Sequence, residues 1–251
     1  MLELPANVGG AEARNKGIAK AKGKWVAFLD DDDEWLPEKL ELQLEAAKAS
    51  ESAFPVIMCK LIARTPRGDY IWPRRLPNPS EHISDYLFAR NSLFKGEGAI
   101  QTSMILTKKD LLNLHGFKKG LQRYQESDWL LRVNKLENID IRYISKPLVI
   151  CYWEEERISI SNSNDWESLF VWIKNNKDLL TARSYSSLIL IQVSVMASKS
   201  GDKRAIFPIL KEALNHGKPK AIGFLLFAGM WLIPQNTRRW LRSIIYRGKN
   251  A

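Results

Sequence analysis

Four consecutive aspartates, Asp30 to Asp33, are the residues of this 251-residue sequence whose type and spacing point most directly to chemistry. They follow Trp25-Val26-Ala27-Phe28-Leu29, an apolar run that predicts a strand buried on both faces. Adjacent carboxylates repel one another unless a cation or a cationic ligand offsets their charge. Because open α/β sheets bind ligands at the carboxyl ends of their strands, the pattern predicts an active-site edge here.

Directly after the acids, Glu34-Trp35-Leu36-Pro37 is predicted to open a helix with 38–50 as its body, and Leu40, Leu44 and Ala47 on its apolar face. Two other interpretations of the acids stay open. They could form a solvated turn that caps the helix, or a calcium loop of the EF-hand type. The calcium loop requires a glycine at its sixth position, where this sequence has a tryptophan.

A glycine pair, Gly9-Gly10, leads into an alanine-rich helix that is predicted to end at Gly23. Free backbone N–H groups at a helix start bind anions, and Arg14 would add a guanidinium group suited to a diphosphate. The alternative is an ordinary glycine turn followed by a surface arginine.

Taken together, these blocks resemble the inverting glycosyltransferases of family 2. The resemblance rests on Asn7-x-Gly9, Ala13-Arg14-Asn15-x-Gly17, Ala21-x-Gly23, Leu29-Asp30-x-Asp32-Asp33 and Glu34-Trp35-Leu36-Pro37-x-Lys39-Leu40-x-x-Gln43. It implies an α/β fold of the GT-A type, a mixed sheet flanked by helices, followed by an α-helical C-terminal extension. It also implies that the Asp-x-Asp group binds a divalent cation together with the diphosphate of a nucleotide sugar.

Site residues follow from the resemblance. The metal ligands would be Asp30, Asp32 and Asp33, binding Mn²⁺ or Mg²⁺, since hard oxygen donors suit these ions. The nucleotide sugar would be bound by Gly9, Gly10, Arg14 and Asp30.

Two further acids, Glu126 and Asp128, stand at the start of a predicted helix that continues as Trp129-Leu130-Leu131-Arg132. Acids at this position can simply complement the helix dipole. The family has an acid-rich motif here, in which a carboxylate accepts the proton of the acceptor hydroxyl. Glu126 falls where the family has an aspartate, so Glu126 is the expected base and Asp128 the alternate.

The resemblance begins partway into the family pattern. Family members start with a strand, a Pro-x-Tyr-Asn-type turn, a helix and a second strand, whereas this sequence opens after them. We therefore expect a chain that is truncated at its N-terminus, lacks the first strands of the sheet and is weakly active or inactive by itself.

Further elements are expected along the chain: strands at Pro55–Cys59 and Ala99–Thr107, a short helix at Lys109–Leu114, a strand pair at Ile141–Trp153 and two helices within 165–198. Residues 64–98 should be a long loop with a short helix near 85–90, a place for acceptor recognition. The segment Arg157–Ser161 could close over the site. We expect a partial catalytic domain over 1–160 and a helical extension over 161–251.

Charge is concentrated in the C-terminal part of the chain. The net charge is +10, and from Lys199 onward eleven Lys or Arg stand against two acids. A nucleic-acid enzyme would carry that excess around its working groove, so no nucleic-acid partner is expected. Instead, basic and apolar residues over 221–251 predict an element that lies on an anionic membrane; a helical pair that packs on the catalytic domain or dimerises is the alternative.

Location and function complete the expectations. The N-terminus lacks the pattern of a signal peptide, and Cys59 and Cys151 lie in apolar runs, as reduced thiols of cytoplasmic proteins do. We expect a cytoplasmic protein, peripheral on the inner face of the cytoplasmic membrane. It would transfer a sugar from a nucleotide-diphosphate donor to a saccharide or lipid-linked acceptor in surface polysaccharide or glycolipid assembly. The alternatives are a non-catalytic remnant that binds a membrane or partner, and a nucleotidyltransferase.

Overall fold

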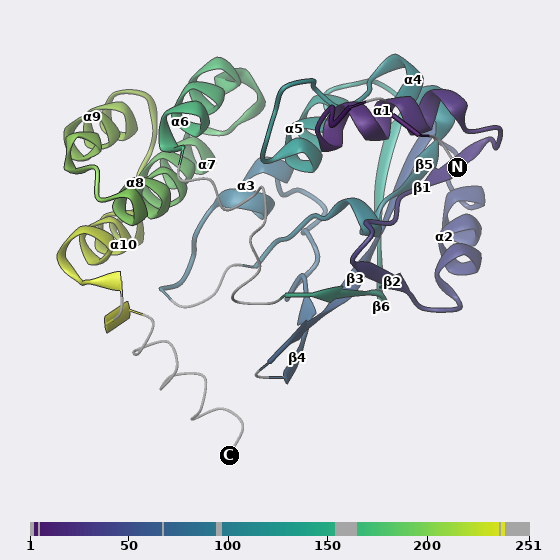
Figure 1. Ribbon diagram of the computed structural model, residues 1–251, viewed down its shortest axis with the longest axis horizontal. Coiled ribbons are helices and arrows are strands. Elements are labelled where there is room, and N and C mark those ends of the chain that lie inside the picture. Colours follow the sequence, from purple (N-terminus) through teal and green to yellow (C-terminus); the bar gives the residue numbers. More distant parts are fainter. Residues whose placement is uncertain are drawn as a thin grey trace. The chain divides into compact units, whose positions relative to one another are not determined.

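The computed structural model describes residues 3–4, 6–66, 68–93, 97–153, 165–235 and 237–238 (Figure 1). The chain forms two compact units. The first comprises Met1–Leu87 and Glu97–Asn162, and the second comprises Phe88–Gly96 and Ser163–Ala251. In the described ranges, no helix has both the length and the apolar character needed to cross a membrane.

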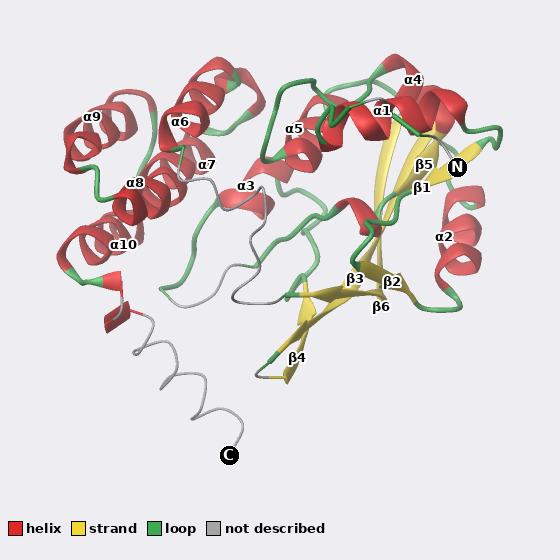
Figure 2. Cartoon of the chain, viewed as in Figure 1, coloured by secondary structure: helices red, strands yellow, loops and turns green. Residues whose placement is uncertain are grey.

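The first unit is built around a mixed sheet (Figure 2). Its strands are β1 (Trp25–Ala27), β2 (Asp33–Trp35), β3 (Phe54–Thr65), β4 (Gly68–Trp72), β5 (Leu106–Lys108) and β6 (Ile139–Tyr152). The strand order is β1-β5-β3-β6-β2, with β4 paired to β3 outside this path. Among the strand pairs of the described residues, β3–β6 is parallel and the others are antiparallel. The predicted mixed sheet is confirmed.

Five α-helices belong to the described part of the first unit: α1 (Gly10–Lys20), α2 (Lys39–Lys48), α3 (Ile83–Phe88), α4 (Lys109–Leu114) and α5 (Gln125–Val133). Helix α2 packs against β3 and β6, whereas α4 contacts β5 and α1. The helices flank the sheet (Figure 2), so the predicted α/β class is confirmed.

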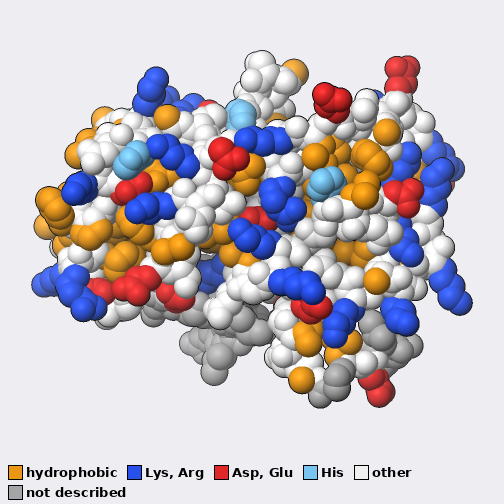
Figure 3. Space-filling view, turned by 90° about the horizontal axis from the view of Figure 1, so that it is seen from above, with side chains coloured by type: hydrophobic (Ala, Val, Ile, Leu, Met, Phe, Trp, Pro, Cys, Tyr) orange, Lys and Arg blue, Asp and Glu red, His pale blue; other side chains and the backbone are white. Residues whose placement is uncertain are grey.

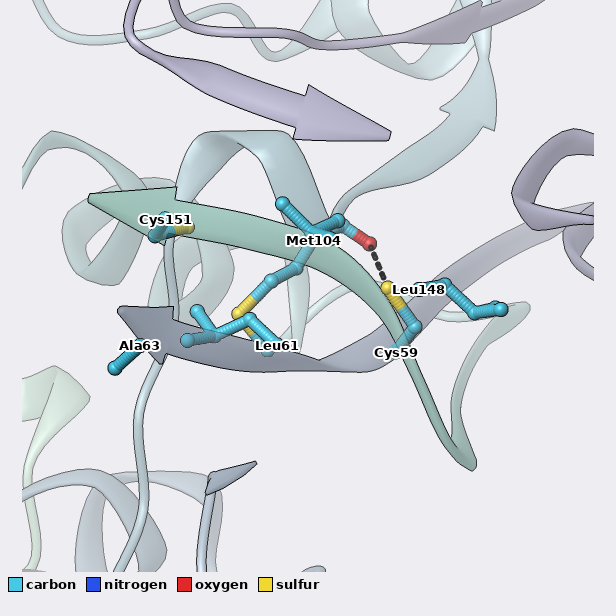
Figure 4. Close-up of a cluster of buried hydrophobic side chains, with 7 residues drawn as sticks. Cys59, Leu61, Ala63, Met104, Leu148 and Cys151 are labelled. Atoms are coloured by element: carbon cyan, nitrogen blue, oxygen red, sulfur yellow. Dashed lines mark hydrogen bonds between the residues drawn. The ribbon is translucent and has the colours of Figure 1, made fainter. Parts of the chain in front are cut away.

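The centre of the core is the β3–β6 pair, and Figure 4 shows part of it. Its fully or almost fully buried members include Cys59, Leu61, Ala63, Met104, Leu148, Val149 and Cys151. The apolar run of β3 and the apolar segment 148–151 of β6 are typical of strands covered on both faces. Both cysteines are free, and burial raises the pKa of each thiol, that of Cys59 to about 11. The prediction of buried thiols is confirmed.

The strand before the four aspartates is shorter than predicted. Only Trp25–Ala27 pairs, with β5 alone, and these three residues are half-buried, while the Leu29 side chain is 49% exposed. The expectation of a strand buried on both faces is wrong. Because β1 is the end strand of the described sheet, neighbours cover it on one edge only.

The residues after the aspartates also differ from the prediction. Asp33–Trp35 forms strand β2, which pairs antiparallel with Cys151–Val149 of β6, and the helix begins only at Lys39. The predicted helix start at Glu34 is wrong, because pairing with a distant strand prevails over the local helix signal. The buried face of α2 consists of Lys39, Gln43 and Ala47. Leu40, predicted for that face, is 41% exposed.

Three other segments are corrected. The predicted loop over 64–98 contains strand β4, which forms a hairpin with the end of β3. The predicted strand over Ala99–Thr107 contains a buried 3₁₀ turn, η1 (Thr102–Met104), before the short strand β5. The predicted strand pair at Ile141–Trp153 is one long strand, β6. Helices α4 and α5 occur where they were predicted.

The second unit is helical in its described part. It contains α6 (Trp166–Asn175), α7 (Ala182–Ser187), the π-helical segment η4 (Leu188–Val193), α8 (Ser194–Ser200), α9 (Ile206–His216) and α10 (Ala221–Leu232). Short 3₁₀ turns, η3 (Lys177–Leu179) and η5 (Lys203–Ala205), link some of them. Leucine, isoleucine and valine side chains of η4 are buried, and α6, α7, α8, α9 and α10 all contact this segment.

Candidate active site

The four aspartates form the turn that connects β1 to β2. The turn is closed by a hydrogen bond from Asp33 N to Asp30 O, 3.1 Å long. Ser103 holds it at both ends: its hydroxyl accepts from Asp30 N at 3.0 Å and donates to the carboxylate of Asp33. Burial raises the pKa of Asp33, and the hydrogen bond from Ser103 partly offsets this increase. The Asp33 carboxylate is therefore already hydrogen-bonded to another side chain of the protein.

Arg14 of α1 joins this turn to the start of α5. Its Nη2 lies 2.8 Å from Asp30 Oδ1, and its Nη1 donates to Gln125 Oε1 at 2.7 Å. The same Nη1 lies 3.5 Å from Glu126 Oε1. One guanidinium thus contacts two carboxylates that belong to separate elements, as the planar fork of arginine allows.

The glycine pair shapes the approach of Arg14. Gly9 precedes α1 with φ +78°, a conformation that glycine adopts without strain, and its N–H donates to Asn7 Oδ1. A β-carbon at Gly10 would lie 3.2 Å from Arg14 Nη1 and 3.3 Å from Gln125 Oε1. Gly10 therefore leaves the space in which these side chains meet.

An aromatic and amide framework holds α1 in place. Asn15 accepts from Phe117 N at 2.9 Å and donates to Phe117 O at 2.8 Å. The Phe117 ring packs edge-on against Phe28 and lies 5.9 Å from the buried ring of Trp129. Since Asn15 lies one residue after Arg14, this framework fixes where the guanidinium enters the site.

The two acids of α5 have different surroundings. Glu126 is half-buried and accepts a hydrogen bond from Thr102 Oγ1. Asp128 is fully buried and accepts from Arg132 Nε at 2.8 Å; Arg132 in turn donates to Gly116 O. Glu126 therefore borders the site, and Asp128 belongs to an internal ion pair.

A pocket of about 430 Å³ opens beside Arg14. It is lined by Gly10, Arg14, Asp30 and residues 122–126, which end in Glu126. The fold thus brings together four of the predicted site residues. Gly9, Asp32, Asp33 and Asp128 do not line it. Its volume lies in the range of small-molecule sites.

A metal site complete with three side-chain ligands is not preformed in the described ranges, where no three His, Cys, Asp or Glu side chains are arranged to hold an ion. Asp30 is paired with Arg14, and Asp33 with Ser103. The carboxylates of the turn nevertheless fit one way in which proteins bind Mg²⁺ or Mn²⁺. Such ions are commonly held by one or two carboxylates plus substrate phosphates, and the turn offers Asp30 and Asp32.

Sequence reasoning missed three residues of this site: Thr102, Ser103 and Gln125. Two of them lie in the segment predicted as a strand, where adjacent side chains would point to opposite faces of the sheet. The available signal was a pair of hydroxyl residues inside an apolar stretch. The expected closing segment, Arg157–Ser161, lies outside the described residues.

Comparison with known proteins bears on this geometry. The family model described as glycosyl transferase family 2 matches residues 1–114. Over these residues, a little less than half of the chain, the sequence is that of a glycosyl transferase family 2 domain. The match contains α1, the aspartate turn and η1.

Similar proteins are glycosyltransferases by name. A Haemophilus influenzae protein described as an uncharacterized glycosyltransferase is 25% identical over 84% of this chain and 72% of its own length. The Bacillus subtilis protein TuaG, named for teichuronic acid biosynthesis, is 34% identical over 55% of this chain and 57% of its own length. The chain thus spans little more than half of TuaG.

Among solved structures, Staphylococcus aureus TarS 1–349 aligns over 91% of this chain and 72% of its own length, at 15% identity and a TM-score of 0.46. A similarity this low carries no functional argument. The predicted family is confirmed by the sequence match, and the predicted fold class by the sheet and helices of the first unit.

Proposed function

We propose that this family 2 chain transfers a sugar from a nucleotide-diphosphate donor to a hydroxyl acceptor, with inversion at the anomeric carbon. The catalytic part is the segment 1–160, and 161–251 is a helical extension. One observation carries the proposal: Arg14 contacts both Asp30 and Glu126 beside one pocket. The Arg14 guanidinium, which can bind a diphosphate, thus lies beside two carboxylates. Asp30 can bind a cation, and Glu126 can accept a proton.

The acceptor's proton goes to Glu126. As the acceptor oxygen bonds to the anomeric carbon, the bond from that carbon to the diphosphate oxygen breaks, and the proton moves to the carboxylate. Glu126 suits this role better than Asp128, because Glu126 borders the pocket and Asp128 is buried against Arg132. Arg14 and the N–H groups at the start of α1 stabilise the diphosphate that departs.

Asp30 and Asp32 would hold Mn²⁺ or Mg²⁺ together with the donor's diphosphate. When bound, the ion acts as a Lewis acid that offsets the charge of the leaving group. Asp33 was also expected to bind it; in the proposed arrangement Asp33 instead stiffens the turn through Ser103.

The acceptor is proposed to be a saccharide or a lipid-linked saccharide of surface polysaccharide assembly. The support is that the similar protein TuaG is named for teichuronic acid biosynthesis. The pocket is open, as an acceptor that carries a long chain requires.

Calorimetry tests the donor and metal assignment. Wild-type protein should bind UDP in the presence of Mn²⁺, and Asp32→Ala should weaken that binding by about tenfold or more. Asp31→Ala is the matched control, since it removes the same charge from the same turn but lies outside the Asp-x-Asp pair. Equal binding by wild type and Asp32→Ala would reject the assignment.

The second unit supports a further part of the proposal, peripheral attachment to an anionic membrane on the cytoplasmic side. Large apolar side chains are exposed on α9 (Phe207, Leu214) and on α10 (Leu225, Leu232), each pair seven residues apart and therefore on one helix face. Figure 3 shows hydrophobic side chains lying among lysine and arginine side chains on this unit. Apolar contact combined with basic charge is what interfacial helices use.

Vesicle flotation tests the attachment. The chain should float with anionic vesicles, less so as salt rises, and should float less when Leu225 and Leu232 are replaced by serine. Leu114→Ser is the control, because Leu114 is 67% exposed on α4 of the first unit. Flotation that persists after Leu225 and Leu232 are replaced, but is lost when side chains within 1–160 are replaced, would contradict this role.

A further inference from the structure

Two adjacent hydroxyl side chains on η1 contact the two halves of the site. Thr102 Oγ1 donates to Glu126 Oε1. Ser103 Oγ accepts from Asp30 N at 3.0 Å and donates to Asp33 Oδ2. Both residues are almost completely buried, at 1% and 0% exposure.

The backbone of η1 explains how neighbouring residues serve different partners. In a 3₁₀ turn successive side chains are about 120° apart, so they point to different elements rather than to opposite faces of a sheet. The turn is closed by bonds from Met104 N to Gln101 O and from Ile105 N to Thr102 O.

The core anchors this turn. Met104 is fully buried among the residues of Figure 4, and its carbonyl accepts from Gln43 Nε2 at 2.8 Å. The Cys59 thiol also faces that carbonyl. The β3–β6 core and α2 therefore hold η1 through contacts that are separate from those with the site acids.

From this arrangement we infer that η1 is the positioning element of the site, with a separate task for each hydroxyl. Thr102 fixes the carboxylate of Glu126 toward the pocket. Ser103 fixes the conformation of the aspartate turn and so the donor-binding geometry of Asp30. The inference rests on the proposed function, because it assigns these tasks within that reaction.

The contacts differ from those of an ordinary buried hydroxyl. Thr107, five residues further on and also fully buried, donates to the backbone carbonyl of Pro55 at 2.8 Å, which is a typical way to satisfy a core threonine. Thr102 and Ser103 instead donate to carboxylates. Hydrogen bonds to ionised groups are shorter and about twice as strong as neutral ones, so they can orient a carboxylate.

The experiment separates the two tasks in the full chain. Thr102→Val should lower kcat by about tenfold while the affinity for UDP with Mn²⁺ stays close to wild type. Ser103→Ala should lower that affinity by about tenfold. Thr102→Ser, which restores the hydroxyl, should recover most of the lost kcat. Thr107→Val is the matched control: it removes an equally buried hydroxyl and should change melting temperature without this division between kcat and affinity.

The outcomes are distinguishable. If wild-type protein binds UDP with Mn²⁺ but Ser103→Ala binds it equally well, the inference fails and the donor assignment stands. If Thr102→Val keeps full kcat, or Thr102→Ser does not recover it, the task given to Thr102 is wrong. If wild-type protein binds no UDP with Mn²⁺, the proposed function fails, and the task given to Ser103 fails with it. If it binds UDP but shows no transfer to any saccharide acceptor, the proposed function fails, and the task given to Thr102 fails with it.

Discussion

Arg14 Nη2 lies 2.8 Å from Asp30 Oδ1, so the first carboxylate of the predicted metal motif is already paired with a cation of the same chain. The two side chains are 21% and 31% exposed. A half-buried ion pair that water still reaches contributes modestly to stability, on the order of 1 kcal/mol. The pair matters for metal binding, because a metal ion and the Arg14 guanidinium would compete for the Asp30 carboxylate.

That competition predicts opposite changes for two ligands when Arg14 is replaced by alanine. Mn²⁺ alone should bind more tightly, since Asp30 loses its internal partner. UDP with Mn²⁺ should bind about tenfold more weakly, because the diphosphate loses a guanidinium. Calorimetry of both ligands checks this, with Lys119→Ala as a control that removes an exposed positive charge paired to Glu12. Parallel changes in the two affinities would contradict the competition.

Gly10→Ala should weaken UDP binding without much loss of stability. The new β-carbon would approach Arg14 Nη1 and Gln125 Oε1 to 3.2 and 3.3 Å, so both side chains must shift. Gly17→Ala in the same helix is the control, since a β-carbon there meets nothing within 4 Å and alanine should stabilise the helix by about 0.5–1 kcal/mol. Calorimetry and thermal melts measure both effects. Wild-type affinity in Gly10→Ala would show that Arg14 needs no such space.

The two acids of α5 should respond in different ways. Glu126→Gln should lower kcat by about 10²–10⁴ and leave the melting temperature nearly unchanged. Asp128→Asn should lower the free energy of unfolding by about 1.5–3 kcal/mol, because it weakens the charged hydrogen bond with Arg132. Turnover and chemical denaturation of both variants provide the comparison. A stable Asp128→Asn variant without activity, beside an active Glu126→Gln variant, would make Asp128 the base.

A buried lysine predicts how stability changes in mildly alkaline solution. Lys39 is fully buried, its Nζ donates to Gln43 Oε1 at 2.6 Å and lies 4.4 Å from the centre of the Trp35 ring. Burial lowers its pKa to about 8. In an unfolded chain a lysine titrates near 10.4, so between these values the unfolded state binds more protons.

The contribution of Lys39 to stability should therefore rise with pH from about 8 toward 10, by up to about 3 kcal/mol. The raised pKa values of the Cys59 and Cys151 thiols act in the opposite direction. Below about pH 8 the group contributes no slope, because both states hold the proton. The difference in stability between wild type and Lys39→Met should change with pH by that amount, while the difference for Lys48→Met, a change at an exposed position of the same helix, should stay constant. Denaturant unfolding at several pH values provides the test. A slope that persists in Lys39→Met would assign the effect to another group.

Local sequence patterns predicted a large part of the fold. The apolar run at Pro55–Cys59 lies within the central strand β3, and the acids at 126 and 128 open a helix as expected. Helix α4 occurs over the predicted residues. These elements are set by periodicity and by signals at helix ends, which act over a few residues.

Other features were missed because their causes lie far along the chain. Asp33–Trp35 is a strand only because β6, more than a hundred residues later, offers a partner. Lys39 and Gln43 are buried because Gln43 reaches the carbonyls of Ile57 and Met104 on other elements. No local pattern contains those partners.

By itself, the sequence determined which chemistry the chain carries: a row of aspartates after an apolar strand, an arginine after a glycine turn and two acids at a helix start. Only the tertiary structure decided how these groups are shared. It pairs Arg14 with Asp30, directs Asp33 to Ser103, leaves Glu126 beside the pocket and buries Asp128. The physical reason is that a charged group takes the partner that the fold brings within a few ångströms, and that partner can come from any part of the chain.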